Sequence, residues 1–266
     1  MFSLKDITVG HYVNTRSVVH RLDPRTKCAA VILLMAAVIV AKSAYFYILV
    51  TVGCFALTLI AELPWAMVVR NLRAFIWLFA ITFGIHLFFT PGTPLTPFPI
   101  KGVTITSEGL ERGIFFSYRL ALLIVSAALF TLTTSPTELT DGIERMLKPL
   151  RRLGLPVHEL AMTMTIALRF IPTLVEEADR LRKAQLARGA HFSGGLVKRA
   201  RALIPLMLPL LLSAFRRADE LAAAMDARCY RGGKGRTHFR ELKLARWDYL
   251  ALAATGAVCV SGLVVT

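Results

Sequence analysis

Apolar residues in this chain occur in long blocks that are separated by short charged or proline-containing segments. A helix that crosses a lipid bilayer needs about 20 mainly apolar residues. Five blocks approach this length, and each is predicted to form a membrane-spanning helix: residues 26–41, 44–61, 74–90, 110–134 and 249–266. The segment from 91 to 107 contains four prolines. Because proline breaks helices, this segment is predicted to form an ordered external loop.

Residues 135–246 have a different pattern, because their apolar positions recur at helical spacing among many charges. Ser135-Pro136-Thr137-Glu138 has the form of a capping box with proline at the first helical position, which predicts a helix that ends near Gly154. A second helix is predicted from residue 156 to 189, and a third from about 196 to 228. With a rise of about 1.5 Å per residue, each of these two long helices would be about 50 Å in length.

Each long helix has an apolar face that another surface must cover, and the two faces are predicted to cover each other in a crossed pair. Pro205 and Pro209, which lie four residues apart, are expected to bend the second helix across the first. The crossing is predicted to use small and apolar positions on both helices: Ala167, Ile171 and Ala178 on the first, and Leu206, Leu210 and Ala214 on the second.

The distribution of basic residues predicts the orientation in the membrane. Lys and Arg are enriched in the cytoplasmic segments of membrane proteins. Residues 1–27 contain five of them, and residues 135–246 contain 21 against 11 Asp and Glu. The chain is therefore predicted to be an all-α polytopic membrane protein with about five membrane spans: a four-span domain (1–134), a cytoplasmic domain with two long helices (135–246) and a C-terminal span (247–266).

The composition agrees with a membrane protein. Hydrophobic residues make up 55% of the 266 positions and the mean hydropathy is +0.58, whereas soluble domains usually contain about 45–50% apolar residues. The formal net charge of +15 would suit nucleic acid, an anionic membrane surface or an acidic partner. Nucleic acid is disfavoured, because the basic residues flank apolar segments and lie along amphipathic faces that need protein to cover them.

Two similar tripeptides lie at the predicted ends of the long helices: Ala187-Arg188-Gly189 and Ala227-Arg228-Cys229. A cation at a helix C-terminus complements the helix dipole, and glycine can take the left-handed conformation that ends a helix. Small flanking residues would let such a helix end enter a groove on another protein, where a guanidinium forks onto carboxylates or carbonyls. One such arginine would be unremarkable, but two matching ends on successive helices indicate a docking function.

Four segments, taken together, resemble the transmembrane T component of energy-coupling factor (ECF) transporters. They are the run Ser17-Val18-Val19-His20-Arg21-Leu22-Asp23-Pro24-Arg25-Thr26-Lys27, the turn Thr133-Thr134-Ser135-Pro136, the run Ala167-Leu168-Arg169-Phe170-Ile171-Pro172, and Ala184-Gln185 leading into Ala187-Arg188-Gly189. The resemblance covers essentially the whole chain in the expected order. It implies a membrane scaffold that joins a substrate-binding S component to two ABC-type ATPases.

The resemblance also implies roles for the two tripeptides, since the paired Ala-Arg-Gly motifs of that family lie on coupling helices whose arginines dock into grooves of the ATPases. Arg188 matches the motif fully, whereas Cys229 stands in place of the second glycine and puts a tight C-terminal turn there in doubt. The apolar faces of the crossing residues would contact the S component. That component selects the substrate, so a vitamin and a transition metal both remain open. Val9-Gly10-His11-Tyr12 before Ser17 favours a T component shared among several S components.

Other candidate chemistry is sparse. Arg119 and His86 lie within predicted spans, where snorkelling and hydrogen bonding in a core, respectively, explain them as well as function does. Gly232-Gly233-Lys234-Gly235 lacks the Ser or Thr of a phosphate-binding loop, and no catalytic or metal site and no cofactor is expected. A permease subunit of another ABC system remains an alternative, although such subunits usually present a short coupling loop. An intramembrane enzyme is disfavoured, because it would need a cluster of polar catalytic groups.

Overall fold

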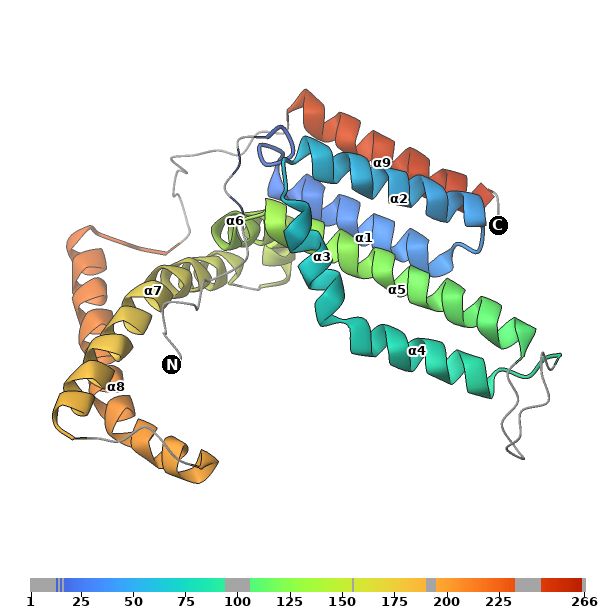
Figure 1. The fold of residues 1–266 in the computed structure, drawn as a ribbon. Helices are drawn as coiled ribbons and strands as arrows, with labels where there is room; N and C mark the ends of the chain where they lie inside the picture. Colours follow the sequence, from blue (N-terminus) through green and yellow to red (C-terminus); the bar gives the residue numbers. More distant parts are fainter. Residues whose placement is uncertain are drawn as a thin grey trace. The chain divides into compact units, whose positions relative to one another are not determined.

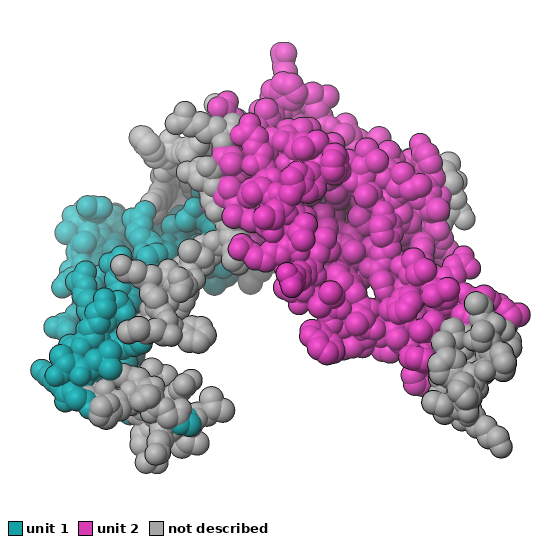
Figure 2. Space-filling model, in the orientation of Figure 1, with its two compact units in different colours: residues 1–10, 136–241 teal, residues 11–135, 242–266 magenta. Residues whose placement is uncertain are grey.

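The computed structural model describes residues 13, 15, 17–93, 106–154, 156–189, 195–232 and 245–264. Within these ranges the regular elements are helices, and no strand is present. The chain divides into two compact units, shown in Figure 2: residues 11–135 with 242–266, and residues 1–10 with 136–241. We refer to them as the membrane unit and the coupling unit.

Six α-helices of the membrane unit are described, and they are labelled in Figure 1. They are α1 (Pro24–Val40), α2 (Ala44–Ile60), α3 (Trp65–Ala74), α4 (Ile76–Phe89), α5 (Ser107–Thr133) and α9 (Arg246–Val264). Each apolar block predicted to span the membrane coincides with one of these helices to within a few residues at either end. The block from 74 to 90 includes a break at Phe75, which separates α4 from the short amphipathic α3.

The lengths of these helices bear on how many can cross a bilayer. Helix α5, with 27 residues, is long and apolar enough to do so by itself. Helices α3 and α4 meet the same requirement only as a pair, and they are bent by 51° at the break between them. Helix α2 is apolar but has 17 residues. The count of five spans therefore stays a prediction, while the all-α membrane fold is confirmed.

The membrane unit exposes large apolar side chains and buries polar ones. Helix α4 has no buried residue, and its Trp77 and Phe89 side chains are 78% and 81% exposed. The apolar core is formed around Phe46, Val38 and Leu132, each almost completely buried. In water an apolar surface of this extent would be unfavourable, whereas lipid chains solvate it at no cost. This distribution is typical of a protein whose helices face lipid.

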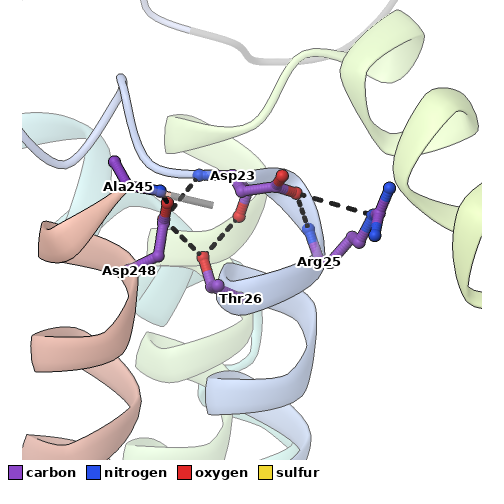
Figure 3. Close-up of polar contacts among 5 residues, drawn as sticks. All are labelled: Asp23, Arg25, Thr26, Ala245 and Asp248. Carbon is purple, nitrogen blue, oxygen red and sulfur yellow. Dashed lines mark hydrogen bonds and ion pairs between the residues drawn. The ribbon is translucent and has the colours of Figure 1, made fainter. Parts of the chain in front are cut away.

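A buried polar cluster joins the two sequence ends of the membrane unit (Figure 3). Oδ1 of Asp248, a residue of α9 that is 2% exposed, accepts hydrogen bonds from the Asp23 N–H at 2.8 Å and the Thr26 hydroxyl at 3.0 Å. Oδ2 of the same carboxylate accepts from the Ala245 N–H at 2.7 Å. Asp23 in turn caps α1 by accepting from the Arg25 N–H at 3.0 Å. Asp23 is therefore the N-cap of α1, and it is itself held by the last helix.

Lys27 extends the same polar region to α5. Its ammonium group donates to the carbonyl of His20 at 3.0 Å and to the carbonyl of Thr133 at 2.9 Å, and the side chain is buried. The Ser17 hydroxyl lies 2.7 Å from Nδ1 of His20. Unpaired backbone carbonyls at the end of a buried helix are costly, and Lys27 satisfies that of Thr133 where α5 ends.

The coupling unit contains α6 (Pro136–Leu147), the 3₁₀-helix η2 (Lys148–Leu153), α7 (Val157–Ala187) and α8 (Leu196–Ala227). Gly154 has a positive φ of 85° directly after η2 and so reverses the chain between α6 and α7. A hydrogen bond between Nδ1 of His158 and the Glu144 carboxylate, 3.0 Å apart, connects these two helices. The three predicted helices of this region are therefore present. Figure 1 shows α8 running across α7 and changing direction along its length, as expected for a helix that contains Pro205 and Pro209.

Candidate functional site

Helix α7 ends in a left-handed turn at the first predicted docking motif. Ala187 is its last residue, and Arg188 is the C-cap, whose N–H donates to the carbonyls of Ala184 at 3.2 Å and Gln185 at 3.1 Å. Gly189 then has a φ of 85°, and its N–H donates to the carbonyl of Leu186 at 3.0 Å. The glycine is needed here, because residues with a Cβ are disfavoured at such a φ.

Helix α8 ends in the same way at the second motif. Arg228 is the C-cap after Ala227, and Cys229 takes the left-handed conformation with a φ of 55°. The Cys229 N–H donates to the carbonyl of Asp226 at 2.9 Å and the Tyr230 N–H to that of Met225 at 3.1 Å, which is the hydrogen-bond pattern of a Schellman motif. The tight turn that the sequence put in doubt is therefore formed, with cysteine in the position that glycine usually occupies.

The two helix tips, residues 187–189 and 227–229, have matching geometry. Arg188 has φ and ψ of −87° and 10°, and Arg228 has −91° and 11°. All six residues of the tips are exposed. Each guanidinium therefore extends from the negative end of a helix dipole, flanked by small residues, and is free to form a two-pronged contact with a carboxylate or with backbone carbonyls.

The residues predicted to form the crossing are distributed unevenly between exposed and buried positions. Leu206 is buried, and Ala178, Leu210 and Ala214 are half-buried. Ala167 and Ile171 are exposed. The role of these residues in the crossing stays a prediction.

The side-chain contacts between α7 and α8 include a polar set that sequence reasoning missed. The Glu177 carboxylate of α7 accepts a hydrogen bond from the Ser213 hydroxyl at 2.7 Å and another from Nη2 of Arg217 at 2.8 Å, both from α8. We call these three residues the Glu177 cluster. These hydrogen bonds, together with the positive charges of Arg217 and Arg180, lower the pKa of Glu177. One signal was available: Glu177 lies at helical spacing from Phe170, Leu174 and Leu181, so a carboxylate interrupts an apolar stripe.

An apolar pocket of 360 Å³ lies between the part of α7 that precedes Glu177 and the part of α8 that leads to its tip. Both helices contribute to its walls, which include Ile166, Phe170 and Leu174 of α7 and Ala214, Leu221 and Met225 of α8. Tyr230, which closes the Schellman motif, also lines it. The contact between the two helices is thus bordered here by an apolar hollow that is partly open to the surface.

Arg119 and His86, the two candidates singled out within predicted spans, have structural contacts. Arg119 of α5 donates from Nε to the Tyr47 hydroxyl at 2.8 Å and from Nη2 to the Ala41 carbonyl at 2.9 Å, and its guanidinium lies 4.9 Å from the centre of the Phe115 ring. The His86 ring stacks on Phe116 with centroids 4.4 Å apart. Arg119 therefore satisfies a carbonyl beyond the end of α1. Among the described residues, no group of three or more His, Cys, Asp or Glu side chains could hold a metal ion.

Comparison with known proteins agrees with the resemblance seen in the sequence. The family described as "Cobalt transport protein", CbiQ, matches residues 15–239. Relatives named "Energy-coupling factor transporter transmembrane protein EcfT" include those of Thermosediminibacter oceani (47% identical over 261 residues, 98% of each chain), Heliobacterium modesticaldum (49% over 259 residues, 97% of this chain and 96% of the relative) and Bacillus subtilis (46% over 243 residues, 90% of each chain). The similarity extends over both units and includes both helix tips. The chain therefore belongs to the CbiQ family, together with the transmembrane proteins named EcfT.

Proposed function

We propose that this protein is the transmembrane scaffold of an ECF-type importer, which couples ATP hydrolysis by two partner ATPases to uptake through an S component. The observation that carries the proposal is the matching geometry of the two helix tips. Two equivalent exposed arginines on one polypeptide suit two nucleotide-binding subunits of similar structure. The names of the relatives, which place them in energy-coupling factor transporters, support the same role.

The proposal places residues 135–246 on the cytoplasmic side, where ATP is available. In this arrangement residues 1–134 and 247–266 anchor the scaffold in the bilayer, in agreement with the excess of basic residues in 135–246. The scaffold does not hydrolyse ATP itself, and separate subunits carry that reaction.

The S component would bind an apolar surface of the coupling unit. In α8 the exposed side chains include Ile204, Met207 and Leu208, which are 63%, 66% and 64% exposed. Leu211, Leu212 and Phe215 continue this surface. Contacts that are mainly apolar and include methionine are non-directional, so they tolerate the exchange of one S component for another. This property fits a scaffold that serves several micronutrients, vitamins among them.

The composition of the purified complex tests the proposal. The tagged chain would be extracted from its native membranes in mild detergent and analysed by native mass spectrometry together with the chains that copurify. We expect one scaffold, two ATPase subunits and one S component, and we expect loss of the ATPases from the Arg188→Ala, Arg228→Ala double variant. Recovery of a single ATPase subunit, or of none, from the unmodified chain would contradict the proposed role of the two tips.

A further inference from the structure

The Glu177 cluster joins the two long helices at a point that is equidistant from their tips. Arg188 follows Glu177 by 11 residues along α7, and Arg228 follows Arg217 by the same 11 residues along α8. In an α-helix 11 residues make about three turns and about 16 Å of length. Each tip arginine therefore lies on the same helix face as the member of the cluster on its own helix, and at an equal distance from it.

The polar contacts of the Glu177 cluster differ in kind from the apolar contacts beside it. The hydrogen bonds of Glu177 to Ser213 and Arg217 are 2.7 and 2.8 Å long, and Ser213 is buried. Hydrogen bonds weaken steeply when their length or angle changes, so this contact fixes one register between the helices. The neighbouring 360 Å³ pocket is lined mainly by apolar side chains, whose contacts are non-directional and permit sliding.

We propose that the Glu177 cluster is the pivot of the coupling unit, the point about which α7 and α8 turn against each other so that the two tips move by equal amounts. The inference rests on the proposed function, because the tips are taken to bind the ATPases. Glu177 and Arg217 are positioning residues in this scheme: they contact neither nucleotide nor substrate, and they act through Arg188 and Arg228.

The equal distances from the Glu177 cluster to the two tips have a mechanical consequence. When two ATPase subunits approach each other, each draws one tip, and a fixed pivot midway converts both movements into a rotation of α7 against α8. Without the pivot, the same movements would be absorbed by sliding along the apolar contact. Loss of the cluster should therefore separate ATP hydrolysis from uptake, while both ATPases stay bound.

The test measures the distance between the ends of α7 and α8, and the uptake per ATP hydrolysed by the intact complex. Nitroxide labels would be attached to cysteines at Ala184 and Ala224, both exposed and one turn before their tips, in a background that lacks the four native cysteines. Glu177→Gln, Ser213→Ala and Arg217→Gln would be compared with Glu176→Gln and Arg216→Gln, their exposed sequence neighbours. Pulsed electron paramagnetic resonance gives the distribution of distances between the two labels. Uptake and ATP hydrolysis are measured with the complex reconstituted in vesicles.

We expect the cluster variants to broaden the distance distribution and to lower uptake per ATP hydrolysed by roughly tenfold, which corresponds to about 1.4 kcal/mol. Both ATPases should still copurify, and the charge-reversed pair Glu177→Arg, Arg217→Glu should restore part of the coupling. The neighbouring variants should change neither quantity. A merely structural role would lower assembly without changing uptake per ATP.

Three results would overturn the pivot: an unchanged distance distribution in Glu177→Gln and Arg217→Gln, a broadened distribution with normal uptake per ATP, or an equal effect of Glu176→Gln. Failure of the proposed function is distinguishable from these. If the unmodified chain bound no ATPase, the distance measurement on the isolated scaffold would still decide whether the cluster fixes the position of α7 relative to α8.

Discussion

The carboxylate of Asp248 accepts a hydrogen bond from the backbone N–H of Asp23, 225 residues earlier in the chain, at 2.8 Å. The same carboxylate accepts from Thr26 and from the Ala245 N–H. One buried side chain of the last helix thus holds the N-terminal cap of the first helix. This connection lies within the membrane unit and outside the two long helices, so its removal should affect folding rather than coupling.

We therefore expect Asp248→Ala to destabilise the membrane unit. It leaves the buried N–H of Asp23 without an acceptor, whereas the Ala245 N–H belongs to an exposed residue and the Thr26 hydroxyl still donates to the Asp23 carbonyl at 2.6 Å. A loss of about 1–3 kcal/mol is therefore expected. For a chain of this size that corresponds to a fall of roughly 2–12 °C in the melting temperature of the detergent-solubilised protein. Asp248→Asn should show a smaller loss, because its amide keeps one acceptor oxygen. Asp219→Asn, at an exposed position of α8, is the control and should leave the melting temperature unchanged.

The tip arginines should be required for binding of the ATPases. Removing one partner of a desolvated charge pair at an interface costs ~2–5 kcal/mol. Arg188→Ala or Arg228→Ala should therefore weaken ATPase binding by about one to three orders of magnitude, as measured by titration of the scaffold in nanodiscs. Lysine should rescue poorly, because an ammonium group cannot form the planar two-pronged contact. Normal binding and transport in the double alanine variant, with Arg216→Ala as the control, would refute this role.

The positive φ of Gly189 makes a separate prediction about tip geometry. A Cβ at Gly189 would meet no other atom within 4 Å, so only the backbone conformation opposes a side chain there. Gly189→Ala should cost ~1–2 kcal/mol of local stability, seen as faster hydrogen exchange in the last turn of α7. Gly256→Ala is the matched control, because its site is equally open but helical; it should be neutral or stabilising.

Substitution of Cys229 by glycine should have the opposite effect on hydrogen exchange. Since it already adopts the left-handed conformation at a φ of 55°, Cys229→Gly should slow exchange in the last turn of α8 by relieving up to about 1 kcal/mol of backbone strain. ATPase binding should be retained, because Arg228 is unchanged. Faster exchange in this variant would mean that the cysteine side chain stabilises the turn by a contact of its own.

The sequence predicted the helices well where one local signal decided them. The capping box at Ser135 and the apolar blocks have short-range causes, and so have the glycine after Arg188 and the arginines at both tips. It predicted the pairing of helices poorly. The Asp23–Asp248 contact and the Glu177 cluster depend on which faces meet after folding, so spacing along one segment does not identify the partners of Asp248 or of Glu177. The break at Phe75 between α3 and α4 was missed for a related reason, because no proline or glycine marks it.

The pH dependence of the Glu177 cluster follows from the lowered pKa of its carboxylate. Hydrogen bonds from Ser213 and Arg217, and the charges of Arg217 and Arg180, favour the ionised form in the folded protein. A carboxylate whose folded pKa is depressed contributes its stabilisation above its unfolded pKa, about 4.3, and loses it as pH falls through the folded value. The distance distribution between labels at Ala184 and Ala224 should therefore be constant from about pH 5 to 8, and it should broaden only in stronger acid. Broadening between pH 6 and 7 would assign the effect to another group.

Locking the two long helices together should stop uptake without releasing the ATPases. Ala178 and Ala214, both half-buried, directly follow Glu177 and Ser213, whose side chains are hydrogen-bonded. Cysteines at these two positions, in a background without the native cysteines, should be joined by a short bifunctional thiol reagent. A covalent link beside the pivot prevents the rotation that the proposal requires, so uptake should fall to background while both ATPases still copurify. Each single cysteine treated with the same reagent is the control for modification alone. Full uptake after complete crosslinking would show that α7 and α8 form a static platform, and that the movement driving transport arises outside their crossing.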